Sequence, residues 1–313
     1  MIKVDLVTGF LGAGKTTFIR EYVNFLTSKG EKIGVIENDF GAINVDMLSL
    51  QDLQTDLCEV EQLVGTNVDS DWKRRFKAKL ISMAMRGFKR IVVEPSGIYD
   101  VDLFFDMLYD DPLTNWYEPG SVISIVDVNL TISSDQMEYY LVSQTANAAS
   151  ILLSKIDSAG SNKISDTVLQ INKSLEKFGC NRKIDDSVIS KQFVDYDSSD
   201  FEKIASSGFI KADHKKLWFD KNDLYSSIFF FDVSMTENDL VNAIRDIFKN
   251  EKVGYIHRIK GFMEKSDSNW LEYNATPTTL STRTVPVGQS VMIIIGEDID
   301  KELIATYLQF KNE

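Results

Sequence analysis

Two glycines, a lysine and a threonine stand at fixed spacing near the start of the chain, in the segment Gly9-x-x-x-x-Gly14-Lys15-Thr16. A loop of this pattern wraps phosphates with successive backbone N–H groups, while the lysine spans the terminal phosphates and the hydroxyl ligates Mg²⁺. The apolar run Ile2–Val7 precedes the loop and a segment of helical spacing follows it, as this chemistry requires. The predicted nucleotide-binding residues of the loop are Gly12, Ala13, Gly14, Lys15, Thr16 and Thr17.

A first acidic side chain, Glu94, follows the apolar run Arg90–Val93 and lies just before Ser96-Gly97. A triphosphatase needs carboxylates that hold Mg²⁺ or its waters, and a glycine lets the backbone approach the terminal phosphate closely. We therefore interpret Glu94 as a catalytic acid in the metal site and Gly97 as a phosphate contact. The alternative is a surface glutamate at the end of a strand.

A second acidic cluster, Glu37-Asn38-Asp39-Phe40-Gly41, follows another apolar run. Either Glu37 or Asp39 could reach the metal, and we predict a catalytic role for Glu37 through the water that it holds. The glycine indicates a segment that changes with the bound nucleotide. An ordinary turn rich in Asn, Asp and Gly is the alternative.

The segment Ser154-Lys155-Ile156-Asp157 contains the residues that we expect to select the base. A carboxylate accepts hydrogen bonds from both N1–H and N2–H₂ of guanine, whereas adenine offers no such donor pair. The stem of Lys155 can pack on the face of the ring. Asp157 therefore favours GTP over ATP, although such a triplet carries weight only because it follows a predicted strand.

Residues 1 to about 157 alternate apolar, β-branched runs with segments of helical spacing, which predicts an α/β domain with a doubly wound, mostly parallel sheet. Each run ends at a polar residue or glycine, and ligands bind beyond the carboxyl ends of such strands. The predicted strands are Ile2–Val7, Lys32–Ile36, Arg90–Val93, Ser121–Val126 and Ala149–Leu153, and the predicted helices are Thr16–Ser28 and Trp72–Arg86.

Residues 158 to about 224 are more polar and indicate a surface stretch that leads to a linker, so we place one domain at 1–210 and a second at 225–313. The second domain has the pattern β-α-β-β-β-α of a small α+β fold. Its predicted elements are strands at Ser226–Val233, Tyr255–Met263, Trp270–Asn274 and Ser290–Ile295, and helices at Glu237–Lys249 and Asp300–Phe310.

Composition excludes several classes of function. The formal net charge of −13 repels nucleic acid and anionic lipid, so we expect neither as a partner. Apolar runs such as Val291–Ile295 are far shorter than the roughly 18 residues of a membrane span. Two cysteines far apart in sequence, with no leader-like segment before the first predicted strand, favour the cytoplasm.

Together these motifs resemble the CobW-like GTPases, which belong to the same broad class as HypB and UreG. The segment Arg258-Ile259-Lys260-Gly261-Phe262 in the second domain extends the resemblance to nearly the whole chain. The resemblance implies slow, Mg²⁺-dependent GTP hydrolysis that is coupled to delivery of a metal or metallocofactor. It also implies a client metalloenzyme or cobalamin- or corrinoid-dependent protein, with a homodimer as one assembly that fits.

The chain departs from this family at its metal motif. Where the family has Gly-Cys-x-Cys-Cys, the corresponding segment Gly65–Asp69 contains no cysteine, so zinc and cobalt stay open as cargo metals. Asp69 and Asp71 could offer oxygen ligands, but acids also favour the start of a helix. A rebuilt tetrahedral site would need every His and Cys of the chain, namely His214, His257, Cys58 and Cys180.

A second departure is Ser154, which stands where the family usually has Asn, so guanine preference rests on Asp157. Three functions remain open from the sequence. The first is a GTPase switch for metal or cofactor delivery. The second is a nucleotide-sensing scaffold with vestigial hydrolysis. The third, a metabolite kinase, gives no role to Asp157 or to the second domain.

Overall fold

The computed structural model describes residues 1–39, 50–64, 69–97, 99–158, 161–185, 188–217, 226–265 and 269–310. The chain divides into two compact units, of which the first comprises most of residues 1–219 and the second most of the remainder. The predicted domain limits at residues 210 and 225 stay predictions, because residues 218–225 lie outside the described ranges. We describe each unit by itself.

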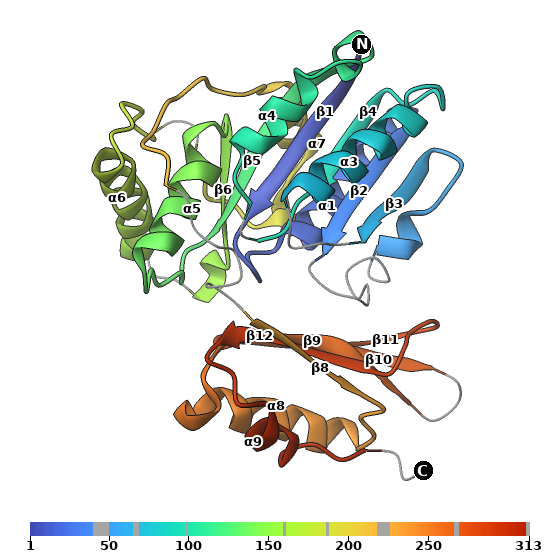
Figure 1. Ribbon diagram of the computed structural model, residues 1–313, viewed down its shortest axis with the longest axis vertical. Helices are drawn as coiled ribbons and strands as arrows, with labels where there is room; N and C mark the ends of the chain where they lie inside the picture. The colour runs from blue at the N-terminus through green and yellow to red at the C-terminus, as the bar shows by residue number, and fades with distance from the viewer. Residues whose placement is uncertain are drawn as a thin grey trace. The chain divides into compact units, whose positions relative to one another are not determined.

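The first unit contains a seven-stranded sheet in the order β3-β2-β4-β1-β5-β6-β7 (Figure 1). Every neighbouring pair is parallel, which confirms the predicted parallel α/β fold. The strands are β1 (Ile2–Gly9), β2 (Ile33–Asp39), β3 (Cys58–Val64), β4 (Arg90–Glu94), β5 (Tyr117–Asp127), β6 (Ser150–Ser154) and β7 (Val188–Ile189).

The parallel register brings the predicted polar strand ends to one edge of this sheet. Glu37 on β2 lies beside Glu94 on β4, and Asp127 on β5 lies beside Ser154 on β6. The central strand β1 ends at Gly9, between β4 and β5. The phosphate loop therefore starts in the middle of an edge with acids on both sides, which is where open α/β sheets bind ligands.

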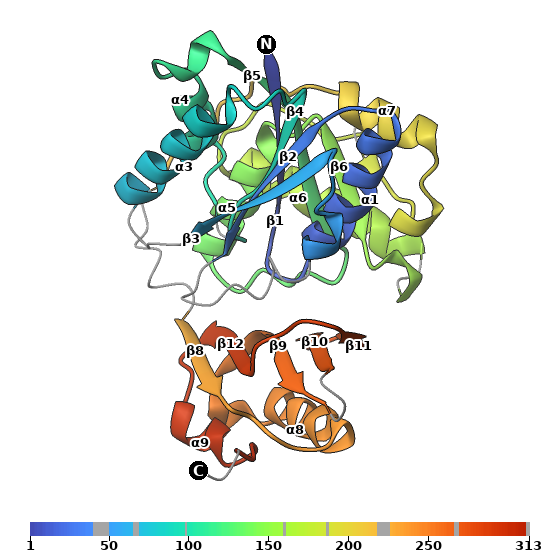
Figure 2. The same cartoon turned by 90° about the vertical axis from the view of Figure 1, so that its right-hand side faces the viewer.

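Helices cover both faces of the sheet, as a doubly wound fold requires. Figure 2 shows α1 and α7 on one face and α3 and α4 on the other. The apolar side chains Phe18, Tyr22 and Leu26 of α1 recur at helical spacing and are buried in the core. The described helices contain none with the length and apolarity to cross a membrane. The helices are α1 (Lys15–Ser28), α3 (Asp69–Met83), α4 (Asp102–Leu108), α5 (Asp135–Ala146), α6 (Ser161–Lys177) and α7 (Ser198–Ser206).

Several elements of the first unit differ from those the sequence predicted. The segment after residue 158 folds into α6, the short strand β7 and α7, whereas we expected a polar surface stretch. The acidic run near residue 197 begins α7 with a capping box, in which Asp197 and Asp200 each bond the backbone N–H of the other. Strand β3 was also missed, because Glu59 and Glu61 interrupt its apolar pattern.

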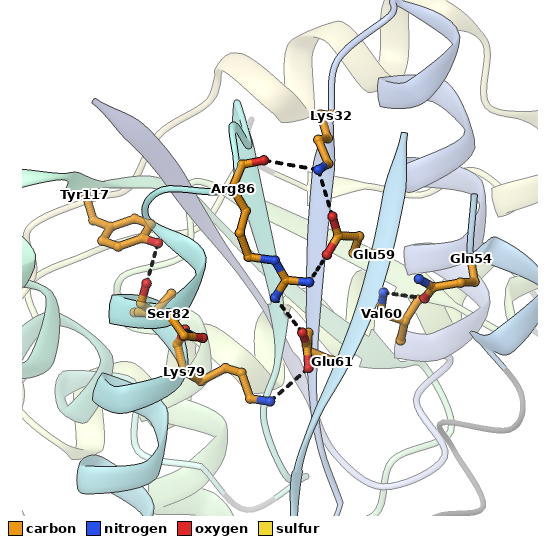
Figure 3. Close-up of polar contacts among 10 residues, drawn as sticks. Lys32, Gln54, Glu59, Val60, Glu61, Lys79, Ser82, Arg86 and Tyr117 are labelled. Carbon is orange, nitrogen blue, oxygen red and sulfur yellow. Dashed lines mark hydrogen bonds and ion pairs between the residues drawn. The ribbon is translucent and has the colours of Figure 1, made fainter. Parts of the chain in front are cut away.

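Figure 3 shows how β3 accommodates those two glutamates. Glu61 accepts a hydrogen bond from Lys79 Nζ at 2.8 Å and one from the Arg86 guanidinium at 2.7 Å. Lys32, which directly precedes β2, pairs with Glu59 at 2.7 Å. Partial burial raises the pKa of Glu61, but Lys79 and Arg86 outweigh burial and lower this pKa overall. Charges on an edge strand also discourage pairing with another chain.

A buried ionic pair lies in the middle of the sheet, between β1 and β4. One guanidinium nitrogen of Arg90 donates to both carboxylate oxygens of Asp5, at 2.6 and 2.7 Å. The Tyr22 hydroxyl of α1 and the Ser121 N–H of β5 also donate to this carboxylate, each at 2.7 Å. Burial raises the pKa of Asp5, and Arg90 opposes that shift. The pair joins three strands and the helix that follows the phosphate loop.

The second unit is an antiparallel sheet in the order β11-β10-β9-β12-β8, with α8 and α9 packed in its apolar core. It confirms the predicted α+β fold but adds β11, whose polar sequence hid it. The closing helix is also shorter than predicted. The elements are β8 (Ser226–Phe231), α8 (Glu237–Lys249), β9 (Tyr255–Glu264), β10 (Trp270–Thr276), β11 (Thr279–Val285), β12 (Val291–Glu297) and α9 (Lys301–Ala305).

The motif Arg258–Phe262 lies on β9, in the middle of this sheet. Ile259 packs in the core with α8, whereas Arg258 and Lys260 alternate with it along the strand. Arg258 Nε donates to Asn274 Oδ1 of the neighbouring strand β10 at 3.0 Å. The basic residues of this motif therefore lie on the sheet face opposite Ile259.

Candidate functional site

Three glycines shape the loop between β1 and α1. Gly9, Gly12 and Gly14 have φ angles of +147°, +73° and +100°, a region that other residues rarely adopt. A Cβ on Gly9 would lie 2.3 Å from the Ile125 carbonyl oxygen of β5, so a side chain there has no space. Gly14 caps α1 without a side-chain hydrogen bond to its first N–H groups. These N–H donors of the helix are the ones that bind phosphate in such loops.

Lys15 and Thr16 form a compact cluster with Glu94, which we call the phosphate-loop cluster. Lys15 is buried, and its Nζ donates to the Gly9 carbonyl at 3.0 Å and to the Phe10 carbonyl at 3.2 Å. Thr16 Oγ1 donates to Glu94 Oε1 at 3.2 Å, across a sequence separation of 78 residues. The sequence predicted all three residues, and the structure brings them together.

The oxygen atoms around Thr16 are of the kind that ligate a hard divalent cation. Glu37 and Glu94 are both buried and lie opposite each other on neighbouring strands, beside the Thr16 hydroxyl that bonds Glu94. Carboxylate and hydroxyl oxygens are the ligands that Mg²⁺ prefers. Asp39 ends β2, but its side chain, together with residues 40–49, lies outside the described part of the chain. The predicted switch Glu37–Gly41 is therefore described only at its start.

Gly97 packs directly against the phosphate loop. A Cβ on Gly97 would lie 2.7 Å from the Leu11 nitrogen and 2.8 Å from Leu11 Cγ. Only glycine permits this approach. The structure thus places Gly97 against the loop that precedes Lys15, as its predicted role near the terminal phosphate requires.

The predicted base-binding residues follow β6 at the same edge of the sheet. Lys155 has a φ of +58°, which is unusual for a residue with a side chain and is typical of functional sites. Its Nζ pairs with Asp127 Oδ2 at 2.7 Å. Asp157 lies in a 3₁₀ turn and is exposed. The buried Ser154 hydroxyl has no hydrogen-bond partner among the described residues, where an Asn amide would offer more donors and acceptors.

Of two further residues near the site, Asp127 was predicted only as a polar strand end and Phe193 was not predicted at all. Asp127 forms an ion pair with Lys155. Its position at the end of β5 is the sequence pattern that indicated it. Phe193 follows the two-residue strand β7. Its ring lies 3.4 Å from where a Cβ on Gly14 would stand and packs edge-on against Phe18 of α1. No sequence pattern indicated Phe193, because β7 is too short to be recognised.

The thiols and imidazoles of the chain do not build a metal site in the described structure. Cys58 is buried in β3, and burial raises the pKa of its thiol to about 11. A thiol in this state is a poor metal ligand. Cys180 is also buried, and the described residues contain no group of three or more His, Cys, Asp or Glu that could hold a metal ion. Residues 65–68, which belong to the segment predicted to stand in place of the cysteine motif, lie outside them.

The parallel sheet, the three-glycine loop and the phosphate-loop cluster define a P-loop nucleotide-binding domain. Residues 3–180, more than half of the chain, match the family model "CobW/HypB/UreG, nucleotide-binding domain". The chain therefore belongs to the CobW/HypB/UreG family.

Curated relatives include the zinc chaperone YjiA of Escherichia coli, which is 32% identical over 181 residues, 55% of each chain. The zinc-regulated GTPase metalloprotein activator 1 of Schizosaccharomyces pombe is 26% identical over 191 residues, 55% of this chain and 44% of that protein. The chain thus spans about half the length of these relatives. The crystal structure of Zn(II)-bound YjiA GTPase from E. coli aligns over 98% of this chain and 97% of that one, with 21% identity and a TM-score of 0.43.

Proposed function

We propose that this protein binds GTP with Mg²⁺ and hydrolyses it to GDP and phosphate, as a switch in delivery of a metal or metallocofactor to a client enzyme. The observation that carries the proposal is the phosphate-loop cluster. It joins Lys15 and Thr16 to Glu94 at the carboxyl edge of a parallel sheet, beside Glu37. Membership of the CobW/HypB/UreG family supports it.

In the proposed reaction the chain acts by positioning and electrostatics. Lys15 would exchange its bonds to the Gly9 and Phe10 carbonyls for the terminal phosphates. Thr16, Glu94 and Glu37 would hold Mg²⁺, which neutralises charge on the phosphates when bound. A carboxylate among them would orient the attacking water, and Gly97 would face the terminal phosphate. Asp39 stays a further candidate ligand.

Guanine selection would rest on Asp157. Its exposed carboxylate can accept from the two guanine donors, while Asp127 holds the lysine stem of Lys155 in place. The Ser154 side chain is too short to replace the Asn amide that the family resemblance implies at this position. We therefore expect GTP to be preferred over ATP, with less affinity than an Asn at position 154 would give.

The cargo is proposed to bind without a thiolate cluster. Two of the relatives are called zinc chaperones or zinc-regulated activators, whereas Cys58 in this chain is buried with its pKa raised. Zinc, cobalt or a cobalamin-type cofactor would then be held by the client or by oxygen ligands. Protein purified without chelators should accordingly carry much less than one zinc per chain, and stoichiometric zinc would contradict this part of the proposal.

Release of phosphate from GTP tests the proposal directly. Lys15→Ala should abolish Mg²⁺-dependent release, whereas Lys173→Ala, an exposed lysine of α6, should leave it unchanged. Tight GTP binding with the nucleotide intact over hours would instead identify a nucleotide-sensing scaffold. Phosphate that appears on a small molecule rather than in solution would identify a metabolite kinase.

A further inference from the structure

The buried amide of Gln144 holds the segment that meets the phosphate loop. Gln144 lies on α5 and is 1% exposed, and its Nε2 donates to the Gly97 carbonyl at 3.0 Å. On its other side Gly97 has no space toward Leu11 of the phosphate loop. Gly97 is therefore fixed between the loop that binds phosphate and a side chain far away in sequence.

The same helix binds the residues that follow Gly97. Ser143 Oγ accepts from the Val101 N–H at 3.0 Å and donates to Asp100 Oδ1 at 3.0 Å. The Tyr139 hydroxyl donates to the other oxygen of Asp100 at 2.8 Å. Gly97, Asp100 and Val101 are thus each hydrogen-bonded to α5. We call Tyr139, Ser143 and Gln144 the α5 clamp.

We propose that Gln144 is a positioning residue for GTP hydrolysis, because it sets where Gly97 stands relative to the phosphate loop. This inference rests on the proposed function. Gln144 itself touches neither Lys15 nor Thr16 in any contact described above, so it acts through Gly97. A polar group placed about 1 Å from its productive position can lower a rate a hundredfold.

The positioning role of Gln144 should affect binding of GTP but not binding of GDP. A loop that meets the terminal phosphate matters only when that phosphate is present, whereas Lys15 and the glycines of the phosphate loop bind both nucleotides. Loss of the Gln144 amide should therefore lower kcat and the affinity for a non-hydrolysable GTP analogue. Affinity for GDP should change little.

The decisive variants are Gln144→Leu, which is close in size but has no donor, and Gln144→Glu. Leucine should lower kcat at least tenfold and weaken the GTP analogue about tenfold, with GDP affinity within twofold of the original. The introduced carboxyl should restore activity as the pH falls, because its protonated form can donate to the Gly97 carbonyl and burial raises its pKa. Gln170→Leu, at an exposed amide of α6, is the matched control.

Equal losses of GDP and analogue affinity, or an unchanged kcat and analogue affinity, would overturn the inference. Absence of hydrolysis in the original protein would defeat the proposed function, yet the ratio of analogue to GDP affinity would still decide the role of Gln144. Where Gln144→Leu does not fold, Ser143→Ala loosens the same clamp. It should shift that ratio in the same direction by a smaller factor, and an unchanged ratio would count against the clamp.

Discussion

The first unit holds two buried ionic groups, the Asp5–Arg90 pair within the sheet and Lys15 at the start of α1, and they are bonded in opposite ways. The Asp5–Arg90 pair lies in mid-sheet, where four hydrogen bonds from three other residues reach one carboxylate. In the phosphate-loop cluster, Lys15 donates to two backbone carbonyls of its own loop. The pair satisfies charge with charge, whereas these two bonds of the lysine go to neutral acceptors that a phosphate can replace.

The kind of partner that a buried charge has therefore distinguishes a structural charge from a functional one. A buried charge with a dedicated counter-ion is costly to disturb, because its partner is left uncompensated in a medium of low dielectric. A charge held by neutral loop atoms keeps most of its electrostatic attraction for an incoming anion. Burial alone would have placed Asp5, Arg90 and Lys15 in one category.

The largest effect is expected when the mid-sheet pair is broken. Asp5→Asn leaves Arg90 buried without its counter-ion and should lower the free energy of unfolding by about 3–5 kcal/mol. Urea denaturation of the first unit measures this loss, with Asp166→Asn on the exposed side of α6 as control. A loss under about 1 kcal/mol would show that the pair contributes little to the stability of the fold.

Replacing the lysine of the phosphate loop should weaken GTP binding more than it weakens the fold. Lys15→Ala should raise the dissociation constant for GTP about 100-fold, which equals about 2.7 kcal/mol. The free energy of unfolding without nucleotide should fall by less than it does in Asp5→Asn, because losing bonds to the Gly9 and Phe10 carbonyls leaves no buried counter-ion uncompensated. Calorimetric titration and urea denaturation of the same variant supply both values. A large destabilisation with little loss of affinity would reverse the comparison.

Acidification tests what burial does to a histidine side chain, which can lose its charge. Burial lowers the pKa of His214 and of His257 below 6.5, although Glu297 opposes the shift at His257. The unfolded chain therefore binds these protons first, and stability falls as the pH drops from about 6.5 through the folded pKa. The slope is at most about 1.4 kcal/mol per pH unit for each histidine.

Hydrogen exchange, read separately in each unit, can resolve the two histidines. His214→Gln should flatten the pH dependence in the first unit and His257→Gln that in the second. Comparison with the original chain at each pH removes the contribution of the carboxylates. Unchanged slopes in both variants would mean that the histidines are not buried as neutral side chains.

The smallest effect is expected at the partly exposed ion pairs of Glu61 on β3. Glu61→Gln removes contacts to Lys79 and Arg86, yet solvent screens them, so the loss should stay below about 1 kcal/mol. Because its folded pKa is lowered, that contribution should also disappear as the pH falls through the folded value. Urea denaturation at low and high salt checks both points. A loss as large as that of Asp5→Asn would remove the distinction between edge and mid-sheet charges.

Much of the fold followed from periodicity in the sequence. The five predicted strands of the first unit lie within three residues of β1, β2, β4, β6 and the apolar part of β5, and Glu237–Lys249 matches α8. These segments bury a continuous face, so their pattern is strong. Strands β3 and β11 failed the same test because both are edge strands, where Glu59, Glu61 or a row of threonines can face solvent.

The site residues also fall into those that a local sequence pattern predicts and those that it does not. Lys15, Thr16, Glu94 and Gly97 were predicted because each sits at a strand end or in a short motif. Gln144 and Phe193 were not, because each reaches the site from an element with no motif of its own. Their positions depend on contacts between segments that are far apart in the sequence, which a local sequence pattern does not reveal.

The glycine cap of α1 has a thermodynamic consequence. Since Gly14 provides no side-chain hydrogen bond to the first N–H groups of the helix, part of the stability of the first unit is left for a ligand to supply. Mass action then makes melting temperature a function of nucleotide concentration. A ligand present at 100 times its dissociation constant adds about 2.7 kcal/mol to the folded state.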